Sequence, residues 1–245
     1  MSRRSVCTNY LALVNPFHPV SPEAEPEQLT EVAFGGGVTL ERQASLLLGR
    51  LLEDIGAFGQ IAVVSGWRSE EAQSVLERAV RQEQETHSRR LLAAPGFSEH
   101  QTGLAVDLCL VNEKVDGSQP VFPYSGIAQI FRSNAARYGF IQRYPSGKRH
   151  ITGFSHNPWH FRYVGVPHAE IISNLAITLE EYLEMIWQHP AGNEPFLFQS
   201  SRYAFEITYL SQEDAKSWTV GNDPMLLSCD NCGGVVRTVW KNKEG

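Results

Sequence analysis

The stretch SEHQTGLAVDLCLV at residues 98–111 decides how this sequence folds. It begins within a polar turn, residues 95–103, that ends at Gly103, and it continues as an apolar strand over residues 104–111. Asp107 lies in the middle of that strand. Because burying an unpaired carboxylate costs several kcal/mol, Asp107 requires a cation, a network of hydrogen-bond donors or a metal ion.

Helices and strands are predicted on both sides of this stretch. Apolar residues at helical spacing predict helices over residues 40–55, 69–84 and 125–138. We expect Thr39 to cap the first of these helices, and Gly56 to end it. A further helix is predicted to start at Thr178, where Thr178 and Glu181 fit a capping box. Short apolar runs over residues 61–64 and 159–164 predict two more strands.

The composition is that of an ordinary globular protein. The chain has 245 residues, a hydrophobic content of 42% and a net charge of −6, which argues against disorder and against a coiled coil. With a pI near 5.8 there is no basic surplus, so nucleic acid is not expected as a partner. No apolar run reaches the ~18 residues that a transmembrane segment requires.

The start of the chain and the cysteine content bear on localisation. Arg3 and Arg4 resemble the basic start of a signal peptide, but polar residues and prolines interrupt the apolar run that should follow. The four cysteines are too few for a disulfide scaffold, which fits a reducing compartment. We therefore expect an unexported, cytoplasmic protein.

The sequence pattern changes near residue 190, from one that predicts both helices and strands to one that predicts strands. Residues 203–210 and 235–240 look like strands joined by polar turns. We expect a main domain over residues 1–190 and a small β-rich appendage over residues 191–245, which at that size packs on the main domain.

Three side chains form a candidate metal site. His100 lies in the turn before Asp107, and alternation along the strand 159–164 places His160 and Arg162 on one side. Two imidazoles and one carboxylate suit catalytic zinc, which keeps its fourth position for water. The alternatives are a histidine that only forms hydrogen bonds and a strand aspartate that pairs with an arginine.

Three blocks of this sequence resemble the zinc D-Ala-D-Ala peptidases of the VanY and VanXY type. The blocks are SGWRS at residues 65–69, SEHQTGLAVD at residues 98–107 and WHFRYVG at residues 159–165, and the resemblance covers roughly residues 10–187. It implies an α+β fold shared with Hedgehog signalling domains, with a central, mostly antiparallel sheet flanked by helices. It also implies zinc bound by His100, Asp107 and His160, and a hydrolase that removes a C-terminal D-alanine.

The resemblance also implies roles for three polar residues. Arg68 matches an arginine that binds the scissile carbonyl and stabilises the developing oxyanion. Gln73 and Ser98 match substrate-contacting positions, Ser98 through the terminal carboxylate. The alternatives are a structural ion pair for Arg68, a solvated helix position for Gln73 and a turn cap for Ser98.

Asn157 departs from the family pattern. The family places a glutamate, the general base, immediately before the Pro-Trp-His run, and this chain has Asn157 there. An amide has no basic site near neutral pH, and general base catalysis typically contributes ~10²–10⁴-fold. Three explanations are open: an inactivating substitution, a neighbour such as His156 acting as the base, or a natural weak enzyme or binder.

The sequence therefore favours a zinc D,D-peptidase. Without an export signal, its expected substrates are free D-Ala-D-Ala or the cytoplasmic pentapeptide precursor, which by resemblance links it to glycopeptide resistance. The alternatives are a non-catalytic zinc module that binds peptidoglycan stems and an L,D-carboxypeptidase.

Two smaller features of the sequence also have alternative interpretations. Cys229 and Cys232 predict a tight turn rather than half of a zinc ribbon. Four aromatic residues line either the substrate pocket or the core, namely Trp67, Trp159, Phe161 and Tyr163.

Overall fold

The segment that carries Asp107 is an inner strand of a four-stranded antiparallel sheet. The computed structural model describes residues 7–33, 35–82, 92–111, 120–200, 203–217 and 223–241. The strand order is β4-β5-β7-β6, and every neighbouring pair is antiparallel. The bounds are β4 (Ile61–Ser65), β5 (Ala105–Leu110), β6 (Phe140–Tyr144) and β7 (Asn157–Tyr163). The predicted α+β class with a mostly antiparallel central sheet is confirmed.

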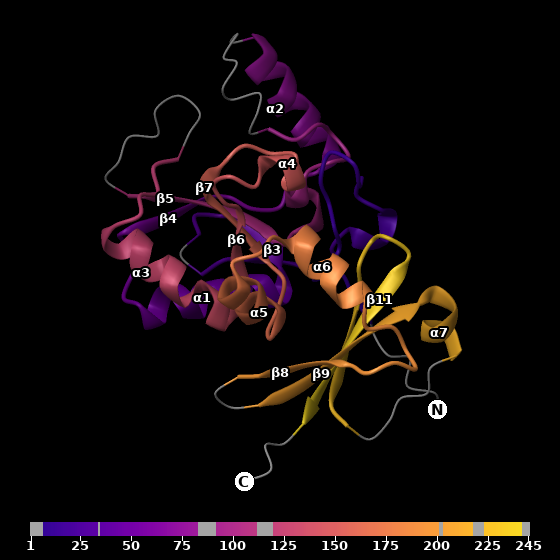
Figure 1. Ribbon diagram of the computed structural model, residues 1–245. Coiled ribbons are helices and arrows are strands. Elements are labelled where there is room, and N and C mark those ends of the chain that lie inside the picture. Colours follow the sequence, from indigo (N-terminus) through magenta and orange to yellow (C-terminus); the bar gives the residue numbers. More distant parts are fainter. Residues whose placement is uncertain are drawn as a thin grey trace.

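Helices cover this sheet, and the chain between them forms short turns and a small hairpin (Figure 1). The hairpin consists of β2 (Leu29–Glu31) and β3 (Thr39–Glu41). The α-helices are α1 (Arg42–Asp54), α2 (Glu70–Gln82), α3 (Gly126–Ala135), α4 (Arg149–Thr152), α5 (His168–Leu175), α6 (Leu179–Trp187) and α7 (Gln212–Ser217). Three 3₁₀ turns also occur in the described residues, namely η1 (Pro22–Ala24), η3 (Glu99–Thr102) and η4 (Ala136–Tyr138).

The first core lies between the sheet and the helices α1 and α3. Leu48 and Leu51 of α1 and Phe131 of α3 pack with Val106 of β5 and Phe161 of β7. The helical spacing of apolar residues in α1 and α3 places them on the side that faces the sheet. The sheet is thereby held rigidly behind the residues that β5 and β7 present on their other side.

The cap of α1 corrects one expectation. Thr39 belongs to β3 and does not cap the helix. Glu41 is the N-cap residue, and its carboxylate accepts hydrogen bonds from the backbone N–H groups of Gln43 and Ala44 at 2.8 and 3.0 Å. A carboxylate satisfies these free donors and also suits the positive end of the helix dipole. The capping box predicted at Thr178 and Glu181 is present at the start of α6.

A second sheet contains both ends of the described chain. Its strand order is β1-β10-β11-β9-β8, with the short N-terminal strand β1 parallel to β10. The bounds are β1 (Cys7–Thr8), β8 (Phe196–Gln199), β9 (Ala204–Ser211), β10 (Met225–Cys229) and β11 (Gly234–Lys241). The β-rich appendage is thus a sheet to which the N-terminal segment adds one strand.

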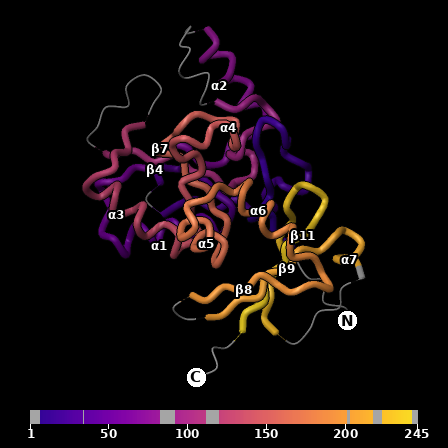
Figure 2. Tube along the Cα trace, viewed as in Figure 1, coloured from indigo at the N-terminus to yellow at the C-terminus, as the bar shows by residue number. Residues whose placement is uncertain are grey.

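Helix α6 lies between the two sheets (Figures 1 and 2). Its residue Leu183 packs in one core with Ile141 and Val164 of the main sheet region and with Ile207 and Val236 of the second sheet. The division near residue 190 remains our proposal, and this shared core is the contact through which the appendage packs on the rest.

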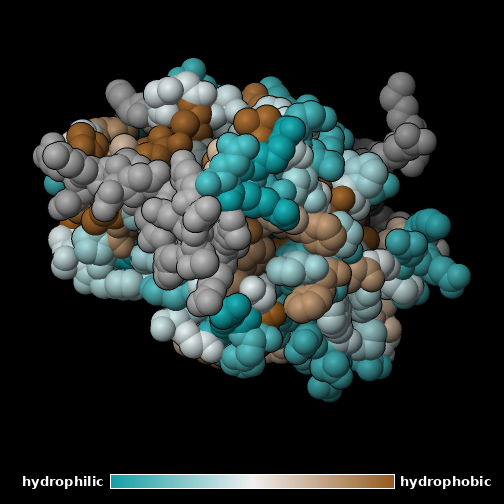
Figure 3. Space-filling model, turned by 90° about the horizontal axis from the view of Figure 1, so that it is seen from above, coloured by the Kyte–Doolittle hydropathy of each residue, from teal (hydrophilic) through white to brown (hydrophobic). Residues whose placement is uncertain are grey.

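The surface around α2 is largely polar. Seen from above, hydrophilic residues cover much of this face and apolar residues form small separate groups (Figure 3). Within the described part of the chain, no helix combines the length and apolar character that crossing a bilayer requires.

Candidate metal centre

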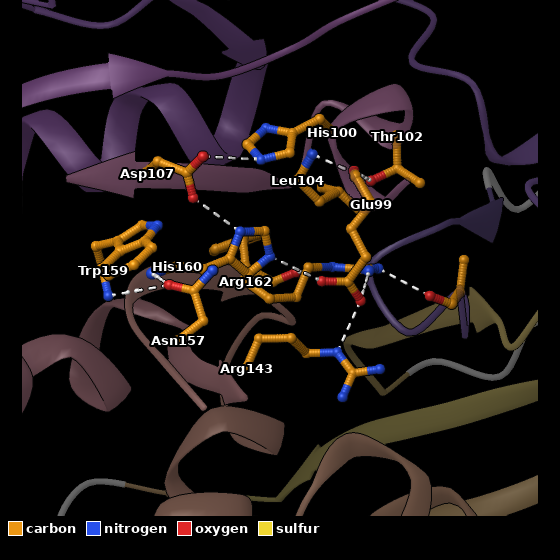
Figure 4. A network of polar contacts seen from close by, with 12 residues as sticks. Glu99, His100, Thr102, Leu104, Asp107, Arg143, Asn157, Trp159, His160 and Arg162 are labelled. Carbon is orange, nitrogen blue, oxygen red and sulfur yellow. Dashed lines mark hydrogen bonds and ion pairs between the residues drawn. The ribbon is translucent and has the colours of Figure 1, made fainter. Parts of the chain in front are cut away.

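His100, Asp107 and His160 converge because two strands and one turn bring them together. Asp107 of β5 and His160 of β7 are directly opposite each other in the antiparallel ladder. His100 lies in η3, and Gly103 returns the chain from η3 into β5 with a φ of +69° that favours glycine. A ligand atom from each of the three residues lies within 4.8 Å of the others. The close-up shows both rings directed at the Asp107 carboxylate (Figure 4).

The hydrogen bonds of the two imidazoles identify the nitrogens that are free to bind a metal. Nδ1 of His100 lies 2.7 Å from the Gly66 carbonyl oxygen, and Nε2 of His160 lies 3.3 Å from Oε2 of Glu99. Both partners only accept hydrogen bonds, so these two nitrogens carry the protons. This arrangement, in which an acceptor fixes the far nitrogen of a ligand histidine, is usual around metals.

The other two nitrogens face the Asp107 carboxylate. Nε2 of His100 is 3.2 Å from Oδ2, and Nδ1 of His160 is 2.9 Å from Oδ1. In neutral rings these nitrogens hold lone pairs, so lone pairs and carboxylate oxygens face one another. Such a set requires a cation between its members, either a proton or a metal ion. The donor set of two nitrogens and a carboxylate therefore fits a divalent metal.

The electrostatics of the site agree with this. Burial lowers the pKa of His100. Burial also disfavours the charged form of His160, but Asp107 and Glu99 outweigh that effect and raise its pKa to about 9. Burial acts to raise the pKa of Asp107, yet the two imidazoles hold it well below its usual range. The carboxylate is thus charged, and a bound metal would replace the proton that His160 holds.

A buried network of charged side chains supports His160. The Glu99 carboxylate accepts hydrogen bonds from Nε of Arg143 at 2.8 Å and from Nη1 of Arg162 at 2.7 Å. Glu180 accepts two more from Arg143, at 2.8 and 2.7 Å. The two arginines hold the pKa of Glu99 well below its usual range although burial opposes them. Sequence reasoning missed Glu99, and its only signal was a position next to His100 in a turn.

Arg68 and Gln73 form a pair beside the metal centre. Arg68 donates from Nη1 to Oε1 of Gln73 at 2.6 Å and from Nη2 to Oγ of Ser65 at 2.7 Å. Both partners are neutral, so the contacts are not those of a structural ion pair, and the guanidinium charge remains available. Gln73 is fully buried and donates to the carbonyl oxygen of Ala93 at 2.6 Å. It is therefore not a solvated helix position, since it holds both Arg68 and the segment at Ala93.

Comparison with known proteins agrees with this geometry. The family model VanY, D-alanyl-D-alanine carboxypeptidase, matches residues 38–166, which include every member of the candidate metal set. The chain belongs to the VanY family. It is 38% identical over 183 residues to the bifunctional D-Ala-D-Ala dipeptidase and carboxypeptidase VanXYC of Enterococcus gallinarum, a match that covers 74% of this chain and 96% of that protein.

Solved structures of VanY-family and related proteins have the same fold. The vancomycin resistance D,D-dipeptidase VanXYg, in complex with a D-Ala-D-Ala phosphinate analogue, matches with a TM-score of 0.88 and 36% identity over 95% of this chain and 94% of that one. At this coverage the match includes the second sheet. A mutant of the D,D-pentapeptidase VanY from a VanB-type resistance cassette, in complex with Zn(II), matches with a TM-score of 0.57 and 32% identity over 71% of this chain and 98% of that one.

Ser98 lies at the start of η3 in this VanY-family chain. It occupies the N-cap position, but its side chain forms no capping hydrogen bond. Its side chain is buried beside His100. The Ser98 side chain therefore does not cap the turn. Its role in substrate binding stays a prediction.

Asn157, at the position where the resemblance leads us to expect a glutamate, is the first residue of β7. Its Oδ1 accepts hydrogen bonds from the backbone N–H groups of Trp159 at 3.3 Å and His160 at 3.2 Å. Because these two donors require an oxygen, they fix the orientation of the amide (Figure 4). The NH₂ group therefore points away from them, and it can donate a hydrogen bond but cannot accept a proton.

His156 is not free to replace the base. Its Nδ1 lies 3.1 Å from the carbonyl oxygen of Tyr144, and its Nε2 lies 3.1 Å from the hydroxyl of Tyr124. Both ring nitrogens thus have partners other than the metal centre. We therefore do not assign proton transfer to His156.

The remaining sequence features divide between core and surface. Phe161 and Tyr163 are buried in the first core, whereas Trp159 is only partly buried and packs against its edge. Trp67 is exposed.

The predicted tight turn after Cys229 is present, with Oδ1 of Asp230 accepting hydrogen bonds from the backbone N–H groups of residues 232 and 234. In the described ranges, only the set of His100, Asp107 and His160 converges closely enough to hold a metal.

Proposed function

We propose that this chain is a zinc-dependent hydrolase of the D-Ala-D-Ala terminus, with turnover limited by Asn157. The observation that carries the proposal is the convergence of His100, Asp107 and His160, in which each imidazole is held by a fixed second partner. The proposed substrates are the free dipeptide and the cytoplasmic pentapeptide precursor of the cell wall. Removing these ends removes the target of glycopeptide antibiotics, so the proposed role is in resistance to them.

The side chains around the centre have complementary tasks. When bound, zinc would lower the pKa of a water molecule and polarise the scissile carbonyl. Arg68, which Gln73 and Ser65 orient, would donate to the carbonyl oxygen as negative charge develops there. A preorganised donor of this kind is worth roughly 3–4 kcal/mol of barrier. The Ser98 hydroxyl would bind the terminal carboxylate.

The relatives support the choice of substrate. VanXYC is named as both a dipeptidase and a carboxypeptidase, and the VanXYg structure that matches almost the full length of this chain is a D,D-dipeptidase. This favours D-Ala-D-Ala over the tetrapeptide stem that an L,D-carboxypeptidase cleaves.

Asn157 favours a second candidate function, which is binding of peptidoglycan stems with little or no hydrolysis. The amide presents a donor where relatives have a base, and this preserves ligand binding while removing proton transfer. Spontaneous deamidation does not supply the missing acid by the usual succinimide route, because Pro158 follows Asn157 and has no backbone N–H.

Release of D-alanine separates the two functions. We would measure it from D-Ala-D-Ala, from the pentapeptide and from the tetrapeptide, using the zinc-loaded chain and its Asn157→Glu and Asn157→Asp variants. The aspartate keeps one oxygen for the two backbone donors and places the other where the NH₂ group now lies. Asn157→Gln, which has the length of glutamate without the acid, is the matched control.

We expect slow release of D-alanine by the unmodified chain and a ~10²–10⁴-fold increase in kcat for Asn157→Glu, with no increase for Asn157→Gln. If the unmodified chain binds the pentapeptide but releases nothing, the binding function holds. If Asn157→Glu also releases no D-alanine while it retains zinc, the hydrolase proposal is wrong.

A further inference from the structure

Two of the four cysteines, Cys7 and Cys229, meet at one edge of the second sheet, and the proposed function does not use them. Cys7 is in β1, Cys229 ends β10, and Cys232 lies in the turn that follows. The Sγ atoms of Cys7 and Cys229 are 2.7 Å apart, although the two residues are 222 positions apart in the sequence. The parallel pairing of Cys7 with Leu227 explains how β1 brings the thiols together.

The distance between these sulfur atoms argues against a shared metal ion. Two thiolates on one tetrahedral zinc, each about 2.3 Å from the metal, are separated by about 3.8 Å. The observed separation of 2.7 Å is shorter than that and closer to the ~2.05 Å of a disulfide bond. Moreover, these cysteines form no three-ligand metal set within the part of the chain that the structure describes.

We propose that Cys7 and Cys229 form a disulfide bond when the protein meets an oxidising low-molecular-weight disulfide. A thiolate of the pair attacks one sulfur of the oxidant, forms a mixed disulfide and releases one small thiolate. The second cysteine, as its thiolate, then attacks the protein sulfur of the mixed disulfide, closes the bond and releases the second small thiolate. The two thiol protons pass to the released thiolates, so the protein loses two electrons and the oxidant gains them.

The surroundings select this pair over the exposed Cys232. Cys7 and Cys229 are both partly exposed, so a small oxidant reaches them. The hydrogen bond from Cys7 lowers the pKa of Cys229, whereas burial and Asp230 raise the pKa of Cys232 to about 11. The attacking thiolate therefore forms at Cys229 rather than at Cys232.

The bond would fasten a segment that supports the metal centre. The N-terminal segment is tied to the end of β10 by Leu11 N–H to Ser228 Oγ and by Leu13 N–H to the Asp230 carbonyl, both at 2.9 Å. The carbonyl oxygen of Ala12 in the same segment accepts from Arg162 at 2.9 Å. Arg162 in turn holds Glu99. A covalent link between positions so distant in sequence also restricts the unfolded chain strongly.

Oxidation of the full-length folded protein tests the proposal. The protein is incubated with oxidised glutathione, alkylated, digested and mapped by mass spectrometry, and its urea midpoint is measured before and after. We expect peptides that link Cys7 to Cys229 and a higher urea midpoint after oxidation. Cys109, which is buried in the main sheet, should remain a thiol that alkylates only after unfolding.

Two serine variants sharpen the result. Cys232→Ser should retain both the linked peptides and the rise in midpoint, and Cys7→Ser should lose both. A link between Cys229 and Cys232, a glutathione adduct with Cys7 left free, or linked peptides without a rise in midpoint would each overturn the proposal.

Discussion

Replacing Glu99 with glutamine should weaken the fold and the metal centre together. The substitution keeps the shape of the side chain and removes one buried negative charge. Arg143 keeps its two hydrogen bonds to Glu180. Arg162 loses its carboxylate partner and retains the backbone carbonyl oxygens of residues 10, 12 and 163.

The magnitude follows from these contacts. Leaving one partner of a buried ion pair without its counter-charge costs about 3–5 kcal/mol. Metal binding suffers separately, because Glu99 accepts the hydrogen bond that orients His160, and loss of such a partner lowers metal affinity ~10–100-fold. We therefore expect Glu99→Gln to lose about 3–5 kcal/mol of unfolding free energy as the metal-free protein.

Urea unfolding of the metal-free protein and zinc competition against a chelating dye measure the two effects. Glu77→Gln is the matched control, because Glu77 pairs with Arg81 on the surface of α2, where such a pair contributes only about 0.3–0.5 kcal/mol. If Glu99→Gln is as stable as the control and binds zinc as tightly as the unmodified chain, the reasoning about the buried network is refuted.

Three further substitutions have defined outcomes. The first substitution is His168→Gln. Burial lowers the pKa of His168 to about 3 in the folded state, whereas in the unfolded chain it is about 6.5. The free energy of unfolding is therefore highest above about pH 6.5 and should fall by about 2 kcal/mol between pH 7.5 and 5, because the unfolded chain takes up a proton that the folded state does not. Urea titrations at the two pH values should show a smaller fall for His168→Gln, and an unchanged fall would contradict this. Gln73→Leu removes the acceptor of Arg68, so kcat should drop while zinc content, measured by elemental analysis, stays at one equivalent; a loss of zinc would argue against a positioning role. Gly103→Ala places a Cβ 3.0 Å from the backbone nitrogen of Glu41 at a φ of +69°, so it should lower the thermal midpoint, and an unchanged midpoint would show that the turn tolerates the methyl group.

Local signals in the sequence were sufficient for three of the four strands of the central sheet, β4, β5 and β7, and for the capping of α6. The apolar run around Asp107 and the pair Thr178 and Glu181 are read within a few residues, and both features are present. The family resemblance supplied the arrangement of the helices and strands.

Long-range contacts could not be predicted in the same way. β6 was missed because it contains Arg143, which in the sequence resembles a surface residue, whereas Arg143 is fully buried against Glu99 and Glu180. The pairing of β1 with β10 brings together segments from the two ends of the described chain, and no local sequence pattern predicts it. The partners of Asn157 depend on the irregularity at the start of β7, where the register with β6 shifts, and sequence spacing does not specify such a shift.

The X-ray absorption spectrum of the zinc-loaded protein at the zinc edge tests the central claim most directly. We predict one bound zinc with only nitrogen and oxygen neighbours at about 2.0–2.2 Å, including the scattering pattern of two imidazoles, as expected for His100, Asp107 and His160. Sulfur neighbours at about 2.3 Å, or failure to retain one equivalent of zinc, would contradict the assignment of the metal centre.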